Sequence, residues 1–181
     1  MSKLIMWNLV TLDGLFEGPK HWDLEFHRSV WGDDLQRLSL EQLESADALL
    51  FGRVTYEGMA MYWRKAEGED AKFMNQLPKI VVSRTLESAD WESSILVRED
   101  PAQAVLELKQ RGTRPIFVFG SANLSRTLIE ANLFDEYRLL VCPVILGAGT
   151  PLFAPGLTAR FTLLESRPFP SGGVLLRYAP A

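Results

Sequence analysis

Apolar residues along the chain gather in short runs that alternate with amphipathic stretches. Four runs are continuous and apolar, as expected of strands covered on both faces, and they lie at 4–10, 48–51, 79–82 and 116–119. Asp13-Gly14 marks a turn soon after the first run. Because helix-like segments separate the runs, the pattern predicts an α/β sheet whose early strands are mostly parallel.

The amphipathic stretches repeat their apolar residues at helical spacing. Helices are predicted over 35–46, 54–63, 71–77 and 101–111, and in the segment that carries Leu124, Leu128 and Leu133 on its inner face. The helix that begins at Pro101 has the clearest boundaries, since Asp100 is an N-cap acceptor and Gly112 a typical stop.

The last third of the chain changes character. Residues 137–146 are strand-like, a glycine-containing loop follows, and the short link between 160–166 and 174–178 predicts an antiparallel hairpin. Residues 16–34 show no clean period and predict a long loop, a common place for a functional lid. No repeat or low-complexity tract divides the chain, so one domain is expected over 1–181.

Charge and cysteine content narrow the function classes. The formal net charge of −4 and the pI near 5.3 argue against a protein whose main partner is nucleic acid or an anionic membrane. No apolar run reaches the length of a membrane-spanning helix. The single Cys142 excludes an internal disulfide, so a cytoplasmic location is the default. No metal site is expected from His21 and His27 alone.

Open sheets bind ligands beyond the carboxyl ends of their strands, so the turns after Val10, Phe51, Val82 and Phe119 are the candidate ligand sites. The last three carry the groups that could bind phosphate. These turns offer free backbone N–H groups, hydroxyls and guanidinium groups, which suit the phosphates of a dinucleotide. They are Gly52-Arg53-Val54-Thr55, Ser83-Arg84 and Gly120-Ser121-Ala122. Each alone also fits an ordinary helix entry with a solvated arginine. The G-x-G-x-x-G and Gly-Lys-Ser/Thr patterns are absent, which disfavours Rossmann and P-loop proteins.

Six motifs in order carry a resemblance that covers nearly the whole chain. They are Thr-Leu-Asp-Gly at 11–14, Leu-Phe-Gly-Arg-Val-Thr-Tyr-Glu at 50–57, Pro-Lys-Ile-Val-Val-Ser at 78–83, Phe-Gly-Ser at 119–121, Leu-Phe-Asp-Glu-Tyr at 133–137 and Pro-Val-Ile-Leu-Gly-Ala-Gly at 143–149. The chain resembles the dihydrofolate reductase superfamily, in the branch related to the C-terminal reductase domain of the bifunctional riboflavin-biosynthesis deaminase-reductase.

The resemblance implies a three-layer α/β fold with a central mixed sheet of about eight strands. It also implies an NADPH-dependent reductase that transfers a hydride to a small heterocyclic or ribosylamino-pyrimidine-like substrate. The family's cofactor-binding positions correspond here to Gly52, Arg53, Thr55, Ser83, Arg84, Gly120, Ser121, Ala122 and Leu124. The family has a Gly-Gly pair joined by a cis peptide where this chain has Gly120-Ser121.

Asp13 is the candidate catalytic residue, to orient the substrate or relay a proton, although an aspartate before Gly14 also forms a turn. Trp22 is placed to stack on a flat substrate. Tyr56 and Gly147 are further candidates for the substrate pocket, and Gly147 could equally make the bend before Pro151.

Two alternatives stay open. A catalytically silent nucleotide-binding or partner-binding scaffold with the same fold is favoured only by the serine at position 121. A serine hydrolase is disfavoured because no G-x-S-x-G motif occurs. The apolar run at 139–146 could serve in a homodimer or lie inside the sheet.

Overall fold

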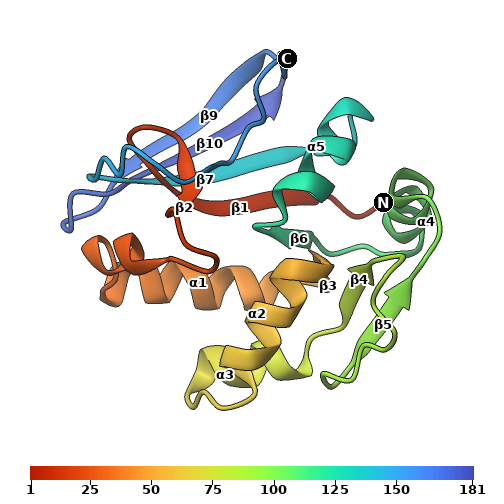
Figure 1. The fold of residues 1–181 in the computed structure, drawn as a ribbon. Helices are drawn as coiled ribbons and strands as arrows, with labels where there is room; N and C mark the ends of the chain where they lie inside the picture. The colour runs from red at the N-terminus through yellow and green to blue at the C-terminus, as the bar shows by residue number, and fades with distance from the viewer.

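The computed structural model describes all residues from 1 to 181 and is built on one large mixed sheet (Figure 1). Its eight strands lie in the order β5-β4-β3-β6-β1-β7-β10-β9, and β2 and β8 form a separate two-stranded sheet. The strands are β1 (Leu4–Thr11), β2 (Leu15–Glu17), β3 (Ala48–Gly52), β4 (Lys79–Val82), β5 (Ser94–Val97), β6 (Ile116–Phe119), β7 (Glu136–Cys142), β8 (Thr150–Pro151), β9 (Phe161–Pro168) and β10 (Val174–Pro180).

The pairing confirms the predicted mixed sheet with an antiparallel C-terminal hairpin. Strands β5, β4, β3, β6, β1 and β7 are parallel, and β10 runs antiparallel to both β7 and β9. Strand β6 lies between β3 and β1, although the chain forms it after β4 and β5. The carboxyl ends of β1, β3, β4 and β6 therefore meet at one edge of the sheet.

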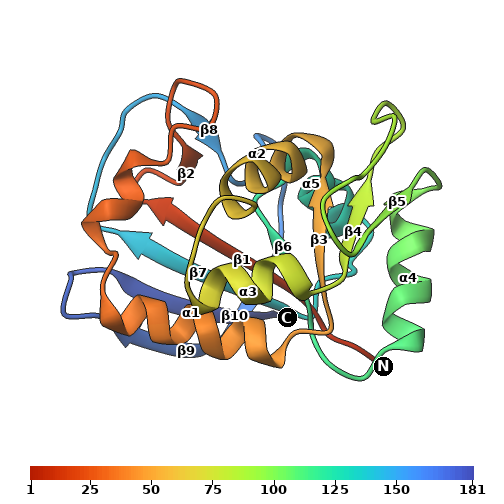
Figure 2. The same ribbon diagram turned by 90° about the horizontal axis from the view of Figure 1, so that it is seen from below.

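Helices cover the two faces unequally. The 3₁₀ helix η1 (Glu25–Ser29) and the helices α1 (Asp33–Ser45), α2 (Arg53–Trp63) and α3 (Glu69–Gln76) pack on one face, around the cluster that contains Trp7 and Phe51. Figure 2 shows α1, α2 and α3 in front of the sheet. The helices α4 (Pro101–Arg111) and α5 (Ala122–Glu130) cover part of the other face, around Met6 and Val118.

The local pattern located most elements. The structure confirms the strands 79–82 and 116–119 and the helix 101–111 with its Asp100 cap, whose side chain accepts hydrogen bonds from the next two N–H groups beyond Pro101. The predicted long loop is wrong in part, since it contains β2 and η1. Strand β5 was not predicted.

Two elements end earlier than predicted, one strand and one helix. The strand expected over 137–146 ends at Cys142, because Pro143 has no N–H for a ladder and Gly147 needs a positive φ of 73°. The helix expected to carry Leu133 ends at Glu130. Leu133 is still buried, in the turn that leads to β7.

The buried Lys79 side chain caps the C-terminal end of α3. The Lys79 side chain is fully buried, and its Nζ donates to the carbonyl oxygens of Met74, Asn75 and Leu77 at 2.7–2.8 Å. These carbonyls at the end of α3 have no intrahelical donors, so the ammonium group satisfies them. The start of β4 is thereby joined to the helix that precedes it.

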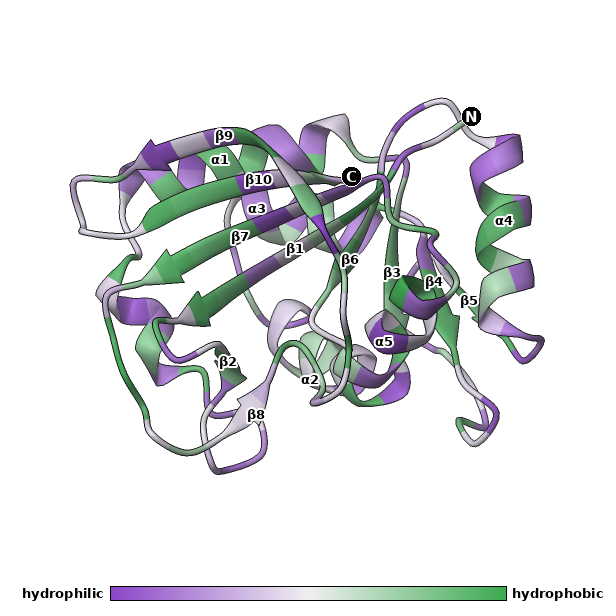
Figure 3. Ribbon diagram, turned by 90° about the horizontal axis from the view of Figure 1, so that it is seen from above, coloured by the Kyte–Doolittle hydropathy of each residue, from purple (hydrophilic) through white to green (hydrophobic).

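No helix of the structure is both long enough and apolar enough to span a bilayer. Figure 3 shows that no helix crosses the face of β7, β10 and β9 that lies opposite α1. Phe161 and Leu163 of β9 are 38% and 53% exposed, and Leu163 pairs with Tyr178 of β10.

Candidate functional site

A cavity of about 580 Å³ lies where β1, β3, β4 and β6 end. This volume is within the range of small-molecule and cofactor sites, about 300–1,000 Å³. Residues from the C-terminal halves of all four strands line it, including Asn8, Gly52, Val82 and Phe119. The position agrees with the rule that ligands of open α/β sheets bind beyond the carboxyl ends of the strands.

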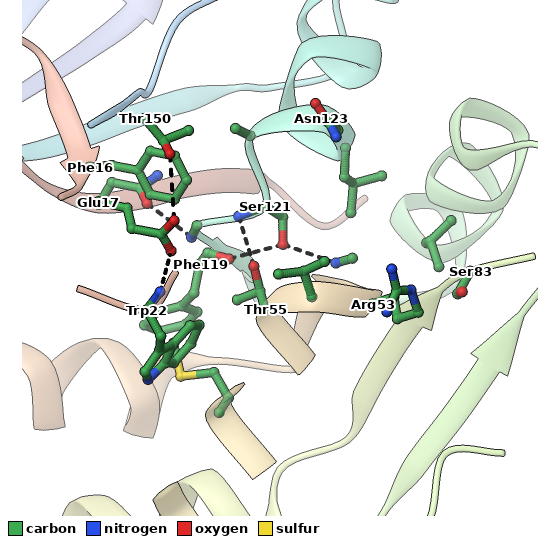
Figure 4. A pocket seen from close by; sticks show the side chains of 18 of the residues that line it. Phe16, Glu17, Trp22, Arg53, Thr55, Ser83, Phe119, Ser121, Asn123 and Thr150 are labelled. Atoms are coloured by element: carbon green, nitrogen blue, oxygen red, sulfur yellow. Dashed lines mark hydrogen bonds between the residues drawn. The ribbon is translucent and has the colours of Figure 1, made fainter. Parts of the chain in front are cut away.

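Hydrogen bonds join the turn after β3 to the turn after β6 in the middle of the cavity wall. The Ser121 Oγ accepts the N–H of Gly52 at 2.9 Å, and the Thr55 Oγ1 accepts the N–H of Ser121 at 3.0 Å. Both are drawn in Figure 4. We call these two bonds the Thr55–Ser121 junction. They place the N-termini of α2 and α5 side by side at the cavity.

The strand β1 is tied to the same junction. The Asn8 Oδ1 accepts the N–H of Gly120 at 2.9 Å. Gly120 has a φ of +55°, and a Cβ there would lie 3.3 Å from Thr55 Oγ1, so glycine fits the turn best. Ser121 adopts a left-handed conformation with a φ of 58°, and all peptide bonds in the structure are trans.

One end of the cavity carries the guanidinium groups. Figure 4 shows Arg53 and Ser83 together at this end. Arg53 forms an exposed 3.1 Å ion pair with Glu57, which is weak and can be exchanged for a ligand. Arg84 lines the cavity and is exposed, with no hydrogen-bond partner for its guanidinium.

The loop that carries Arg84 is held by other polar groups. The Ser83 Oγ accepts the N–H groups of Thr85 and Leu86, and the Arg98 guanidinium donates to the carbonyl oxygens of Arg84, Leu86 and Glu87. Arg84 therefore projects from a fixed turn. We call this part of the cavity the arginine end.

The opposite end is aromatic and acidic. Phe16, Glu17, Trp22 and Thr150 lie together there, as Figure 4 shows. Glu17 accepts the Trp22 N–H at 3.1 Å through Oε2 and the Thr150 hydroxyl at 3.5 Å through Oε1. Glu17 and Thr150 come from β2 and β8, so the small sheet forms this wall. We call this part the Glu17 end.

His27 lines the cavity from η1, the helix that follows Trp22. Burial lowers the pKa of His27 to about 4, because the charged imidazole is poorly solvated there. The imidazole is therefore neutral at pH 7. No group of three or more His, Cys, Asp or Glu side chains is arranged to hold a metal ion.

Comparison with known proteins identifies the family. The model of the RibD C-terminal domain matches residues 2–175. The chain belongs to the RibD C-terminal domain family. It is 31% identical over 183 residues to the uncharacterized protein YyaP of Bacillus subtilis, covering 97% of this chain and 94% of YyaP.

Solved structures confirm the fold of this RibD C-terminal domain. A protein of Shewanella sp. PV-4 assigned to riboflavin biosynthesis matches with a TM-score of 0.82 at 19% identity, over 99% of both chains. The dihydrofolate reductase of Enterococcus faecalis, crystallised with NADP(H), matches with a TM-score of 0.67 at 13% identity, over 98% of this chain and 96% of that one. The predicted dihydrofolate reductase-like fold is therefore confirmed.

The cavity of this RibD C-terminal domain brings together ten of the candidate site residues. They are Trp22, Gly52, Arg53, Thr55, Ser83, Arg84, Gly120, Ser121, Ala122 and Leu124. Their roles toward a ligand stay predictions. Asp13, Tyr56 and Gly147 do not line the cavity.

Asp13 and Gly147 contact each other outside it. The Asp13 carboxylate accepts the Thr11 hydroxyl at 2.6 Å and the N–H groups of Leu146 and Gly147 at 3.3 and 2.8 Å. The hydrogen bond from Thr11 and those from the two backbone N–H groups lower the pKa of Asp13. In this position Asp13 fastens the turn after β1 to the loop after β7, and its role toward a substrate stays a prediction.

Tyr56 lies on the core side of α2. Its side chain is buried, and its hydroxyl accepts the Trp91 N–H at 2.8 Å. Helical spacing explains the position, since Tyr56 and Thr55 are about 100° apart around α2, and Thr55 faces the cavity. Tyr56 therefore supports the helix rather than the ligand.

Sequence reasoning missed Asn8, Glu17 and Thr150, and it favoured a solvated loop position for His27, which lines the cavity. Glu17 and Phe16 occupy consecutive positions before Gly18, which is a weak local signal of a short strand end. Thr150 has no local signal, because it reaches the cavity only through the pairing of β2 with β8 across 133 residues.

The junction predicts a stability effect at Ser121. Ser121→Ala removes the acceptor of the Gly52 N–H and should lower the free energy of unfolding by about 1–3 kcal/mol, measured by urea denaturation. Ser121→Gly loses the same bond but relieves a left-handed backbone that costs other residues about 1–2 kcal/mol, so it should be less destabilised. An alanine variant as stable as the wild type would contradict this role of the hydroxyl.

His27 predicts a dependence of stability on pH. The unfolded chain takes up the imidazole proton near pH 6.5 and the folded chain only near pH 4. The free energy of unfolding should therefore fall by about 2–3 kcal/mol as the pH drops from 6.5 to 4. His27→Gln should remove this part of the pH dependence, and the same change at exposed His21 should leave it, in denaturation series at several pH values. Equal pH profiles for the wild type and His27→Gln would refute the partly buried, neutral imidazole.

Proposed function

We propose that this RibD C-terminal domain is an NADPH-dependent reductase that transfers a hydride to a small heterocyclic or ribosylamino-pyrimidine-like substrate. The family membership supports a reductase-like protein. The observation that carries the proposal is the division of one cavity into the arginine end and the Glu17 end, with the Thr55–Ser121 junction between them.

The cavity offers the donors that a phosphorylated dinucleotide needs. Two helices begin at the junction, so their free N–H groups favour a pyrophosphate there. Arg84 and the Ser83 hydroxyl suit a 2′-phosphate, and Arg53 suits the phosphates nearer the junction. When bound, NADPH supplies the hydride. Residues of the arginine end would hold the phosphates and leave the nicotinamide toward the Glu17 end, where Phe16 and Trp22 would exclude water.

One observation favours the second candidate, a nucleotide-binding scaffold without turnover. The Ser121 hydroxyl accepts the Gly52 N–H, so this donor at the start of α2 is already in use. NADPH consumption with pterin, flavin and aminopyrimidine acceptors separates the two proposals. Tight NADPH binding with no acceptor reduced supports the scaffold.

Cofactor binding gives the first test of the reductase. Arg84→Ala should weaken NADPH binding roughly 10- to 100-fold, the value of a charge-assisted phosphate contact, and should affect NADH much less because NADH lacks the 2′-phosphate. Arg53→Ala should also weaken NADPH. Titration of NADPH fluorescence measures both affinities.

Arg126→Ala is the matched control for Arg53→Ala. Like Arg53, Arg126 pairs with a glutamate four residues further on, but it lies outside the cavity. It should bind NADPH as the wild type does. If Arg84→Ala weakens NADH and NADPH equally, Arg84 does not bind a 2′-phosphate.

We also propose that the protein is a homodimer in the cytoplasm, with a second copy on the uncovered face of β7, β10 and β9. Phe161 packs there edge-on against Tyr137 at 4.7 Å between ring centroids, and Leu163 lies exposed beside Tyr178. An exposed apolar sheet face of this kind is typical of a protein interface.

The dimer predicts a mass near twice 20.4 kDa in sedimentation equilibrium. Leu163→Asp should give the monomer, since it puts a charge into the apolar face. Leu106→Asp, at an exposed leucine of α4, should not change the mass. A wild-type protein that is monomeric at micromolar concentration rules the dimer out.

A further inference from the structure

A second cavity, of about 200 Å³, is lined by residues of helix α1 and strands β7, β10 and β9. Figure 2 shows α1 in front of β9 and β10. The cavity shares no lining residue with the one at the strand ends. Since a water molecule takes up about 30 Å³ of the liquid, the space admits a small ion with several waters. We call this cavity the α1–β9 pocket.

Three arginines line the α1–β9 pocket, and two carboxylates hold them in place. Arg138 and Arg177 both donate through Nε to Glu136 Oε1 at 2.7 Å. Arg177 also donates to Glu165 at 2.8 Å, and Arg167 lies 3.5 Å from that carboxylate. Burial acts to raise the pKa of Glu136, but hydrogen bonds from Arg177 and Arg138 outweigh it and lower the pKa, so this carboxylate is ionised. Three guanidinium groups thus share two paired carboxylates.

The arginines keep N–H groups that no protein atom accepts. The Nη2 nitrogens of Arg138 and Arg177, and both Nη nitrogens of Arg167, have no hydrogen-bond partner. The Arg138 guanidinium lies over the Phe117 ring at 5.4 Å, and the Arg167 guanidinium lies over the Phe169 ring at 5.2 Å. These cation–π contacts restrict the guanidinium planes, so the free donors are held ready for an anion.

A buried amide adds another donor without a partner. Gln42 of α1 is 3% exposed, and its Oε1 accepts Arg138 Nη1 at 3.0 Å. Turning the amide over would set Nε2 against the guanidinium, so the orientation of the amide is fixed. Its Nε2 then has no hydrogen-bond partner, although Gln42 lines the pocket. Because buried polar groups are nearly always paired, this donor indicates an acceptor that comes from outside the chain.

We propose that the α1–β9 pocket binds a phosphate group, carried by inorganic phosphate or by a small phosphomonoester. The free N–H groups come from three separate arginines and one amide, so they suit an anion with three or more oxygen atoms better than a carboxylate with two. Glu41 also lines the pocket, is exposed and has no ion-pair partner, so its charge limits the affinity. The site lies outside the strand-end cavity and does not depend on the reductase function.

Calorimetric titration with inorganic phosphate tests the site. The protein carries Arg53→Ala and Arg84→Ala, so that the arginine end holds no phosphate, and sodium chloride of equal ionic strength is the blank. We expect saturable binding of phosphate and weaker binding of acetate. No saturable phosphate binding, or acetate bound as tightly as phosphate, overturns the proposal. Glycerol 3-phosphate is titrated in parallel, and whichever of the two phosphates binds more tightly identifies the source of the group.

Substitutions of opposite sign locate the anion. Arg167→Gln should weaken phosphate by about tenfold, the loss of one charge-assisted contact. Glu41→Gln should strengthen phosphate about two- to fivefold, because it removes a like charge at the pocket. The matched controls are Arg111→Gln and Glu44→Gln, at exposed residues outside the pocket, and they should leave the affinity unchanged. Unchanged affinity in Arg167→Gln, or weaker binding in Glu41→Gln, overturns the proposal.

Thermal melting reports whether each variant folds. If Arg167→Gln melts early, Arg167→Lys keeps the charge and must bind phosphate more tightly than Arg167→Gln, and the reverse order overturns the proposal. The side-chain amide of Gln42 gives a local readout by nuclear magnetic resonance. Phosphate should shift its signals, since Nε2 gains an acceptor, and sodium chloride should not. Phosphate binding that leaves the Gln42 amide signals in place would put the anion elsewhere and overturn the proposal.

Discussion

The Thr55–Ser121 junction is the constraint on which the cavity depends. Parallel strands deliver their carboxyl ends to one edge of a sheet, but the turns beyond them are free to diverge. Here the Ser121 hydroxyl and the Thr55 hydroxyl each accept a backbone N–H from the opposite turn, and Asn8 adds a third bond from β1. Two helix N-termini therefore converge at one place, and everything proposed for the arginine end assumes that convergence.

The two ends of the cavity come from different kinds of structure. The arginine end is built on turns that follow strands of the main sheet, with Arg98 bracing the loop of Arg84. The Glu17 end is built on the small β2–β8 sheet and a loop, outside the main sheet. The chemistry of the first end is thus tied to the fold that the family shares, whereas the second can change by loop replacement without disturbing the main sheet.

The sequence predicted what local pattern controls and missed what distant pairing controls. Apolar runs and the Asp100 cap located strands β4 and β6 and helix α4. The strand-end turns and the helices they open gave nine of the residues that line the cavity, and the predicted loop gave Trp22. Asp13 is a candidate catalytic residue because its turn follows β1 and resembles the Asp-Gly turn of the family. Its partners, the N–H groups of Leu146 and Gly147, lie more than 130 residues away and have no signature near residue 13.

The contact between the Trp22 indole and Gly58 links two segments that are 36 residues apart in the chain. Any side chain larger than hydrogen at position 58 would displace the indole, so the identity of a residue on α2 that does not itself line the cavity governs the shape of one cavity wall. Relatives that carry a bulkier residue at this helix position must lack the aromatic ring or seat it elsewhere. The shape of this wall can thus change through paired substitutions, one in the loop and one on the helix.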